Sequence, residues 1–345
     1  MPGHAFGNPL IPWRELRDKV YAGRPAIAII TLLGFAALFL AFSNGANDNF
    51  KGFATIWGSA TLPYRSALIL ATIATVAGGL ASVVLAEGLV SQFSGKGLVG
   101  DDLAGQPRFA LAVATGAAAT VMLATRLGFP ISTTHALVGG LVGAGLAMSA
   151  QPIDLANLGS GFVVPLLVSP IVSAGLGLSF FWFVRRLTGS GPSRGKDTML
   201  GRGLHLLSAT SICFARGVND APKLAALLIG TRLLGEAGAA LGVTVAMGVG
   251  GWLLSRRVAE TMSHKINRLD HRQGITANLV TASLVLVASR LGLPVSTTHV
   301  SVGSIIGTGA GAGTLDRGVV ASVLGSWVLT LPISAGIALL AGLAL

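Results

Sequence analysis

The chain has 345 residues, of which 52% are hydrophobic and 11% are charged, and its mean hydropathy is +0.74. Soluble domains carry about 25% charged residues, so this composition excludes a water-soluble globule. The net charge is nevertheless +11, and the 48 glycines are about twice the usual share of roughly 7%.

Uncharged runs that could cross a bilayer occur along the chain, because a helix of about 20 apolar residues spans the membrane. These runs are Pro25–Asn47, Ser66–Ala86, Leu127–Ile153, Leu155–Val184, Ala237–Ser255, Leu291–Leu315 and Gly318–Leu345. The first run follows basic residues, as in a signal peptide, but it is too long for one and lacks a small-residue cleavage site. We expect a retained transmembrane helix, preceded by a disordered or interfacial tail over residues 1–25.

Two motifs recur in the same order, which indicates an internal duplication. Gly-Ala-Asn-Asp at 45–48 returns as Gly-Val-Asn-Asp at 217–220, an offset of 172. Pro-Ile-Ser-Thr-Thr-His at 130–135 returns as Pro-Val-Ser-Thr-Thr-His at 294–299, an offset of 164. Each copy predicts a helix broken at the Asn-Asp motif, a second helix, a hairpin pair around the Ser-Thr-Thr-His motif and a final helix.

The two copies should have opposite orientations in the membrane. The paired hairpin segments return the chain to the side it came from, whether they cross fully or re-enter, so each copy makes an odd number of crossings. This arrangement is the inverted-repeat plan of secondary transporters. We predict an all-α polytopic membrane protein with a first repeat at 26–187, a basic inter-repeat loop at 188–201 and an inverted second repeat at 202–345.

The Lys and Arg residues of the N-terminal tail and the predicted loops divide unevenly between the two sides, with seven on one and twelve on the other. The larger number lies on the side of the inter-repeat loop. Because positive charge favours the cytoplasm, we expect this loop to be cytoplasmic and both termini outside, although the basic N-terminal tail opposes that orientation.

Seven ionisable residues fall within apparent membrane segments: Asp48, Lys51, Arg126, Arg216, Asp220, Lys223 and Arg290. A charge at mid-bilayer costs about 2.5–3.5 kcal/mol, so embedded ionisable groups are functional candidates. Arg126 and Arg290 have a plainer alternative, because an arginine near a helix end can snorkel to the interface. The excess of three positive charges predicts an anionic ligand.

The Asn-Asp motifs are each followed by a lysine. Asp48 and Lys51 are three residues apart, as are Asp220 and Lys223, so each pair can meet on one helix face as a structural ion pair. The polar sequence around them should interrupt a helix, and exposed backbone at membrane depth needs protein or a water-filled cavity beside it. Oxygens of the motif residues also suit a small cation, and the candidates are Asn47, Asp48, Asn219 and Asp220.

Each hairpin tip offers hydrogen-bond donors to an anion. The proline ends one helix and the following Ser or Thr caps the next, whose free N–H groups and dipole attract negative charge. Capping alone explains one tip, but two copies in an inverted duplication converge on a midplane site. The expected donors are Ser132, Thr133, Thr134, Ser296, Thr297 and Thr298. His135 and His299 follow them and either couple protons or simply pack.

These paired motifs resemble those of the inorganic phosphate transporter (PiT) family, from about residue 26 to the end of the chain. The resemblance implies a secondary transporter, often a homodimer, that moves inorganic phosphate with a cation. It implies that the hairpin hydroxyls hold the oxyanion, with Asn47, Asp48, Asn219 and Asp220 beside them.

The chain departs from the family pattern at two kinds of position. Members commonly read Asn-Asp-x-x-Asn, whereas Lys51 and Lys223 stand at the last position here. We hypothesise that these lysines replace bound cations or contact the anion, which makes transport independent of sodium and leaves a proton as the coupling ion. Arg216 stands at the counterpart of Asn44, so the two halves are not chemically equivalent.

Several alternatives remain open. Sulfate or another oxyanion suits the same cage, and a passive anion channel is a different class. An enzyme is disfavoured because the residues are arranged by symmetry, as binding groups are. We expect no cofactor besides Na⁺ or H⁺ as coupling ion, no metal and no nucleic acid, in a bacterial inner membrane. The glycine-rich stretches should pack helices.

Overall fold

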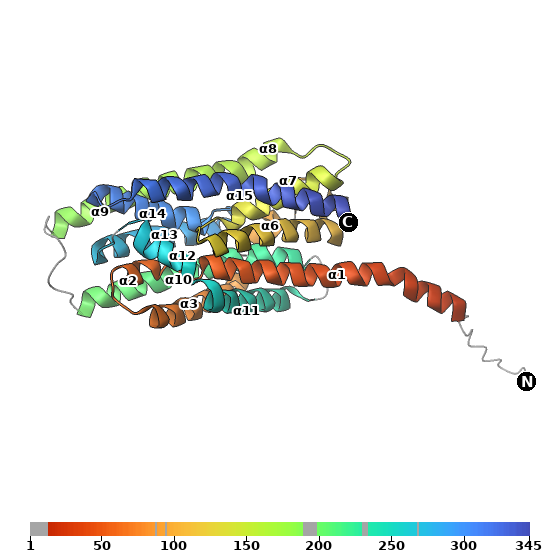
Figure 1. Cartoon of the computed structure of the whole chain (residues 1–345), viewed down its shortest axis with the longest axis horizontal. Helices are drawn as coiled ribbons and strands as arrows, with labels where there is room; N and C mark the ends of the chain where they lie inside the picture. The colour runs from red at the N-terminus through yellow and green to blue at the C-terminus, as the bar shows by residue number, and fades with distance from the viewer. Residues whose placement is uncertain (1–12, 87, 94, 189–198, 230–233, 268) are drawn as a thin grey trace, which may run out of the picture.

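A computed structural model describes residues 13–86, 88–93, 95–188, 199–229, 234–267 and 269–345. The described chain is a bundle of helices, with α1 extending beyond one end of it (Figure 1). Most of the predicted inter-repeat loop at 188–201 lies outside the described residues. The described chain therefore has an all-α membrane fold, as predicted.

The first repeat consists of α1 (Trp13–Asp48), α2 (Ala54–Gly58), α3 (Tyr64–Leu85), α4 (Gly88–Gln92), α5 (Asp101–Ala104), α6 (Pro107–Leu127), α7 (Thr133–Met148), α8 (Leu155–Leu158), a π-helical turn (Gly159–Val163) and α9 (Val164–Thr188). The second consists of α10 (Met199–Ile229), α11 (Glu236–Leu254), α12 (Arg256–Glu260), a π-helical turn (Thr261–Lys265), α13 (His271–Arg290), α14 (Thr297–Ala312) and α15 (Arg317–Ala344).

Six described helical segments are long and apolar enough to cross a membrane. They are Ala26–Asp48, Tyr64–Leu85, Pro107–Leu127, Leu155–Leu187, Glu236–Leu254 and Arg317–Ala344. Helix α1 already begins at Trp13, so the latter half of the predicted 1–25 tail is helical. The hairpin arm α7 is also apolar but has only 16 residues, about 24 Å of helix.

The two Asn-Asp motifs end up in different backbone conformations. Helix α1 ends at Asp48 and turns through Asn49–Phe53, so the first predicted break is present. Helix α10 continues through Asn219 and Asp220, which corrects the predicted break in the second repeat. The cause is local: the first repeat has helix-disfavouring Asn49 and Gly52 after the motif, where the second has alanine and leucine. Pro222 in α10 removes only one helical hydrogen bond.

The two repeats are interleaved. Helix α1 packs on α11 while α3 packs on α10, and α7 packs on α15 while α14 packs on α9. Each of these contacts recurs with its partners exchanged, as the duplication requires. In Figure 1, α1 enters the bundle from one end and α10 from the opposite end, which is the predicted inversion.

Glycines allow these helices to cross closely. A Cβ at Gly45 would overlap the Met247 backbone of α11, and one at Gly250 would overlap the Phe42 carbonyl of α1. The hairpin arms behave alike, since Gly143 lies against Ala335. The predicted helix-packing role of the glycines is therefore confirmed.

Candidate functional site

The two hairpin tips form helix caps, as their sequences predict. The Ser132 side chain accepts a hydrogen bond from the His135 backbone N–H at 3.0 Å, and Ser296 accepts one from the His299 N–H at 3.1 Å. Both serines are therefore used in starting α7 and α14. Their hydroxyls fix the position of the first turn of each helix. The backbone N–H groups of a first turn have no partner inside the helix.

The tips of the two repeats also contact each other. Thr134 Oγ1 donates to the Val295 carbonyl at 3.3 Å, and Thr298 Oγ1 donates to the Ile131 carbonyl at 2.7 Å. Each threonine thus bonds to the backbone just before the cap of the opposite tip. The structure brings all six predicted hydroxyl residues together in the protein interior, where each is buried.

Lys51 extends from the first repeat to the tip of the second. Its ammonium group lies 2.6 Å from Asp48 Oδ2, so the predicted ion pair forms. The same nitrogen donates to Thr298 Oγ1 at 2.5 Å and to Thr297 Oγ1 at 3.1 Å. Lys51 is therefore more than the partner of Asp48, because it joins the Asn-Asp motif of one repeat to the hairpin of the other.

Lys223 makes the reciprocal connection. Its ammonium lies 3.6 Å from Asp220 Oδ1 and donates to Thr134 Oγ1 of the first tip at 3.0 Å. It also donates to the Val295 carbonyl at 2.8 Å and to the Asn219 side-chain oxygen. The two lysines consequently lie against opposite hairpin tips.

Asn44 and Arg216 occupy the centre between the two motifs. The Asn44 amide nitrogen lies 3.0 Å from Thr133 Oγ1 and 3.3 Å from both Asp48 Oδ2 and Asp220 Oδ2. Arg216 donates to Asn44 Oδ1 at 2.5 Å, and its Nε lies 3.3 Å from Asp220 Oδ2. Asn44 of the first repeat and Arg216 of the second occupy equivalent positions but differ in charge, so the centre of the cluster is asymmetric.

The cluster carries a smaller net charge than the sequence indicated. Three buried cations (Lys51, Arg216 and Lys223) face two buried carboxylates (Asp48 and Asp220), all at most 4% exposed, which leaves +1. Arg126 and Arg290 are instead exposed in the last turns of α6 and α13. This placement corrects the predicted excess of three, because arginines at helix C-termini are favoured by the dipole and reach the surface.

Asn47 and Asn219 hold the hairpins in place. The Asn47 amide donates to Thr125 Oγ1 and to the Phe129 carbonyl, each at 3.0 Å, and its oxygen accepts from the Ile131 N–H at 3.1 Å. Asn219 donates to Ser289 Oγ at 2.7 Å. Asn47 thus fixes the tip of its own repeat, and Asn219 bonds to the helix that leads to the second tip. Thr125 and Ser289 were missed by sequence reasoning, although their 164-residue spacing marks them as equivalent.

His135 and His299 lie directly behind the tips. Their rings meet edge to face with centroids 4.5 Å apart, and His299 stacks on Trp327 of α15 at 3.9 Å. His299 Nδ1 donates to the Leu166 carbonyl at 3.2 Å. His135 Nδ1 and His299 Nε2 are buried and have no hydrogen-bond partner among the described residues. No pattern in the sequence indicated a role for Trp327.

This donor set is suited to a small oxyanion. Ammonium groups and hydroxyls converge from both repeats in a buried place, where charge-assisted hydrogen bonds are strong. Among the described residues no group of three or more His, Cys, Asp or Glu side chains could hold a metal ion. Fold and site together define a polytopic membrane protein with inverted repeats that meet at a buried cationic cluster.

The model of the phosphate transporter family matches the chain twice, over residues 44–197 and 188–338. The chain belongs to this family. A probable low-affinity inorganic phosphate transporter of Rhizobium meliloti is 31% identical, with 90% of this chain and 94% of the relative covered. One of Mycobacterium leprae is 28% identical, with 90% and 75% covered. A solved structure titled "The sodium-dependent phosphate transporter" has a similar fold, with a TM-score of 0.78, 23% identity and coverage of 92% and 98%.

Proposed function

We propose that the chain is a secondary active transporter of inorganic phosphate, which binds between the two Ser-Thr-Thr-His tips. The observation that carries this proposal is the pair of lysine bridges, in which Lys51 and Lys223 each donate to threonines of the opposite repeat. An anion bound there contacts both repeats at once, as alternating access between inverted repeats requires. The names of the Rhizobium and Mycobacterium relatives support phosphate as cargo.

The binding groups divide into direct donors and positioning groups. Thr133, Thr134, Thr297 and Thr298 offer hydroxyls, and Lys51 and Lys223 offer charge-assisted donors. Ser132 and Ser296 act through their helix caps, which aim backbone N–H groups at the anion. When phosphate enters, its oxygens replace some of the lysine–threonine hydrogen bonds.

Two features favour phosphate over sulfate. The cluster's net charge of +1 is balanced by singly charged dihydrogen phosphate, whereas sulfate at −2 leaves an uncompensated negative charge. Asp48 Oδ1 is buried and has no hydrogen-bond partner among the described residues. A protonated phosphate oxygen can donate to this carboxylate oxygen, but sulfate has no proton to donate.

Lysine ammonium groups beside Asp48 and Asp220 supply the positive charge that a bound sodium ion would bring. We therefore expect sodium-independent transport, with a proton as the coupling ion. The buried His135–His299 pair is the candidate proton carrier, because the two rings touch and each has a buried nitrogen without a hydrogen-bond partner among the described residues. We also expect a homodimer in the cell membrane, the inner membrane of a bacterium.

Uptake of labelled phosphate into proteoliposomes tests cargo and coupling separately. An inward proton gradient should drive uptake, replacement of sodium by choline should not change it, and excess sulfate should compete poorly. Strict sodium dependence would refute the coupling proposal, and equal competition by sulfate would refute the cargo. Saturable uptake with counterflow is expected of a carrier, whereas high single-channel current would identify a passive anion channel.

The Asp48→Asn variant tests the discrimination between the two anions. It removes the carboxylate that accepts from protonated phosphate and raises the cluster's net charge to +2. Because a hydrogen bond to a charged group is worth about 1.5–3 kcal/mol, the preference for phosphate over sulfate should fall about tenfold or more. Asp220→Asn is the matched control: it raises the net charge by the same amount, but both Asp220 oxygens already have partners, so the preference should fall less than in Asp48→Asn. An unchanged preference in Asp48→Asn contradicts the proposal.

A further inference from the structure

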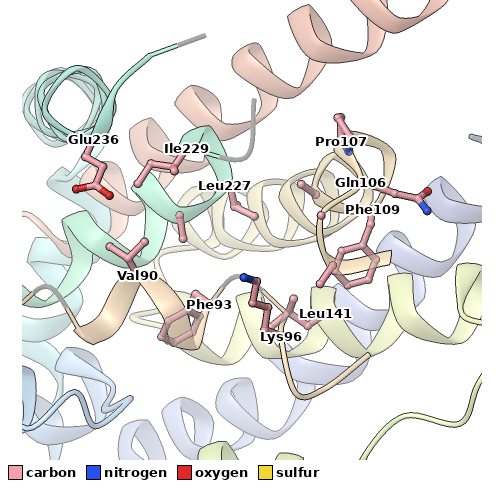
Figure 2. A pocket seen from close by; sticks show the side chains of 14 residues that line it. Val90, Phe93, Lys96, Gln106, Pro107, Phe109, Leu141, Leu227, Ile229 and Glu236 are labelled. Atoms are coloured by element: carbon pink, nitrogen blue, oxygen red, sulfur yellow. The ribbon is translucent and has the colours of Figure 1, made fainter. Parts of the chain in front are cut away.

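Two neighbouring cavities lie at the end of the bundle where Lys96 is found, which we call the Lys96 end. The larger has a volume of about 470 Å³, and Figure 2 shows Phe93 and Lys96 on one side of it and Leu227 and Ile229 on the other. The smaller, of about 210 Å³, shares Ile229 with the larger. Both cavities lie against the last turns of α10, which carries the second Asn-Asp motif.

The larger cavity comes within one side chain of the buried cluster, and the smaller one reaches the residue before Lys223. Phe93 lines the larger cavity, and its ring centroid lies 5.7 Å from the Lys223 ammonium, a cation–π contact. Pro222 lines the smaller cavity and immediately precedes Lys223. From this end, the ring of Phe93 therefore stands between the larger cavity and the proposed phosphate site.

At the opposite end of the bundle, aromatic side chains pack together where the Lys96 end has cavities. Phe50, Trp57 and Tyr64 pack together with ring centroids 5.0 to 5.7 Å apart, and His264 lies edge-on to Trp57 at 4.5 Å. We call these four residues the aromatic cluster. Phe50 is buried between the first Asn-Asp motif and this end of the protein.

The duplication relates the two ends position by position. At the offset of 172 residues, Phe50, Trp57 and Tyr64 of the aromatic cluster correspond to Pro222, Ile229 and Glu236 of the second repeat. All three of those second-repeat residues line the smaller cavity, and the last two also line the larger one. The same three positions are thus hollow at one end and packed with rings at the other.

We propose that the transport path has a gate at each end of the bundle. At the Lys96 end the gate is a single side chain, the ring of Phe93. At the other end it is the aromatic cluster, which is closed in this structure. The cavities are then the anion's entrance to Lys223. Transport requires the aromatic cluster to separate while the cavities at the Lys96 end collapse. This proposal rests on the proposed function for its cargo, but the asymmetry of access can be measured without any transport.

Single cysteines at equivalent positions test the asymmetry. Ala226 lines the larger cavity, whereas its equivalent Ala54 is buried beside the aromatic cluster. In nanodiscs without phosphate, a charged methanethiosulfonate should modify Ala226→Cys at least tenfold faster than Ala54→Cys. The unsubstituted protein gives the baseline, because Cys213 is buried. Equal rates, or a faster reaction at position 54, would overturn the proposal.

Reciprocal exchange of gate residues tests the aromatic cluster itself. Trp57→Ile should raise the labelling rate of Ala54→Cys about tenfold, and Ile229→Trp should lower that of Ala226→Cys by a similar factor. If Trp57→Ile fails to elute as a single helical species, Tyr64→Glu supplies the same test. Unchanged labelling at position 54 in a folded variant would refute the gate. Absence of phosphate uptake by the unsubstituted protein, together with the expected labelling, would refute only the cargo.

Discussion

At the residue scale, the lysines after the Asn-Asp motifs distinguish this chain from an ordinary arrangement of buried ion pairs. A structural pair needs only Asp48 with Lys51 and Asp220 with Lys223. Both ammonium groups also donate to threonine hydroxyls of the opposite hairpin. Because burying an ammonium group is costly, these extra partners offset part of the desolvation cost of each lysine.

The double variant Lys51→Asn, Lys223→Asn should gain sodium dependence. Asparagine removes two positive charges beside Asp48 and Asp220 and supplies amide oxygens, which are ligands for a small cation. Phosphate uptake should become low in choline and rise at least tenfold in sodium. Replacing the exposed Arg126 and Arg290 by asparagine is the matched control and should leave uptake unchanged. Sodium-independent uptake by the double variant would contradict the hypothesis.

Sequence reasoning found the residues of the recurring motifs, but it missed residues that are defined by their contacts, both within a repeat, as for Thr125 and Ser289, and between the repeats. The serine caps were predictable because an N-cap is local in sequence. Asn44 was noted only as the counterpart of Arg216, and its contacts with both aspartates depend on how the repeats interleave. In the final helices the repeats are offset by 161 residues, so the equivalent of Trp327 is Leu166, and the repeat gave no indication of the stacking of Trp327 on His299.

At the element scale, the fold depends on pairs of helices that approach closely through glycine. The hairpin arm α14 packs on α9, where a Cβ at Gly307 would overlap the Ala174 carbonyl. The composition predicted such contacts, but not which helices would meet, because the partners come from opposite repeats. The continuous α10 was also missed, since the motif Asn-Asp is shared and the difference lies in the four residues after it.

Two glycine-to-alanine substitutions should have opposite effects on stability. Gly307→Ala forces α14 away from α9 and should lower the unfolding temperature in detergent by several degrees, since overpacking costs about 1–3 kcal/mol. Gly175→Ala in α9 meets nothing within 4 Å and should be neutral or stabilising by up to about 1 kcal/mol. Equal unfolding temperatures for the two variants would show that the crossing tolerates a side chain.

At the scale of the whole molecule, inversion explains why so few kinds of residue make the site. Each motif is used twice, and each copy contacts the opposite repeat, so the cluster forms only when both halves are folded together. The chain's net charge of +11 can now be divided between the buried cluster and the rest of the molecule. Only +1 belongs to the buried cluster, and most of the remainder lies outside the membrane interior, where it bears on orientation.

Orientation can be tested with a cysteine at each end of the bundle. Gln151 is exposed near Leu98 at the Lys96 end, where Asp154 bonds to the Leu98 carbonyl, and Arg317 is exposed at the other end. The lysine and arginine bias predicts that Arg317 lies on the cytoplasmic side. In intact cells a membrane-impermeant maleimide should label Gln151→Cys, and it should label Arg317→Cys only after permeabilisation.

The reverse pattern would show that the basic N-terminal tail, whose four Lys and Arg residues count toward the smaller total, outweighs the loops. It would also change the meaning of the cavities, because they open at the Lys96 end. With the expected labelling, the structure faces the outside and is poised to accept phosphate from there. With the reverse labelling, the same hollow faces the cytoplasm, and the aromatic cluster closes the site to the outside.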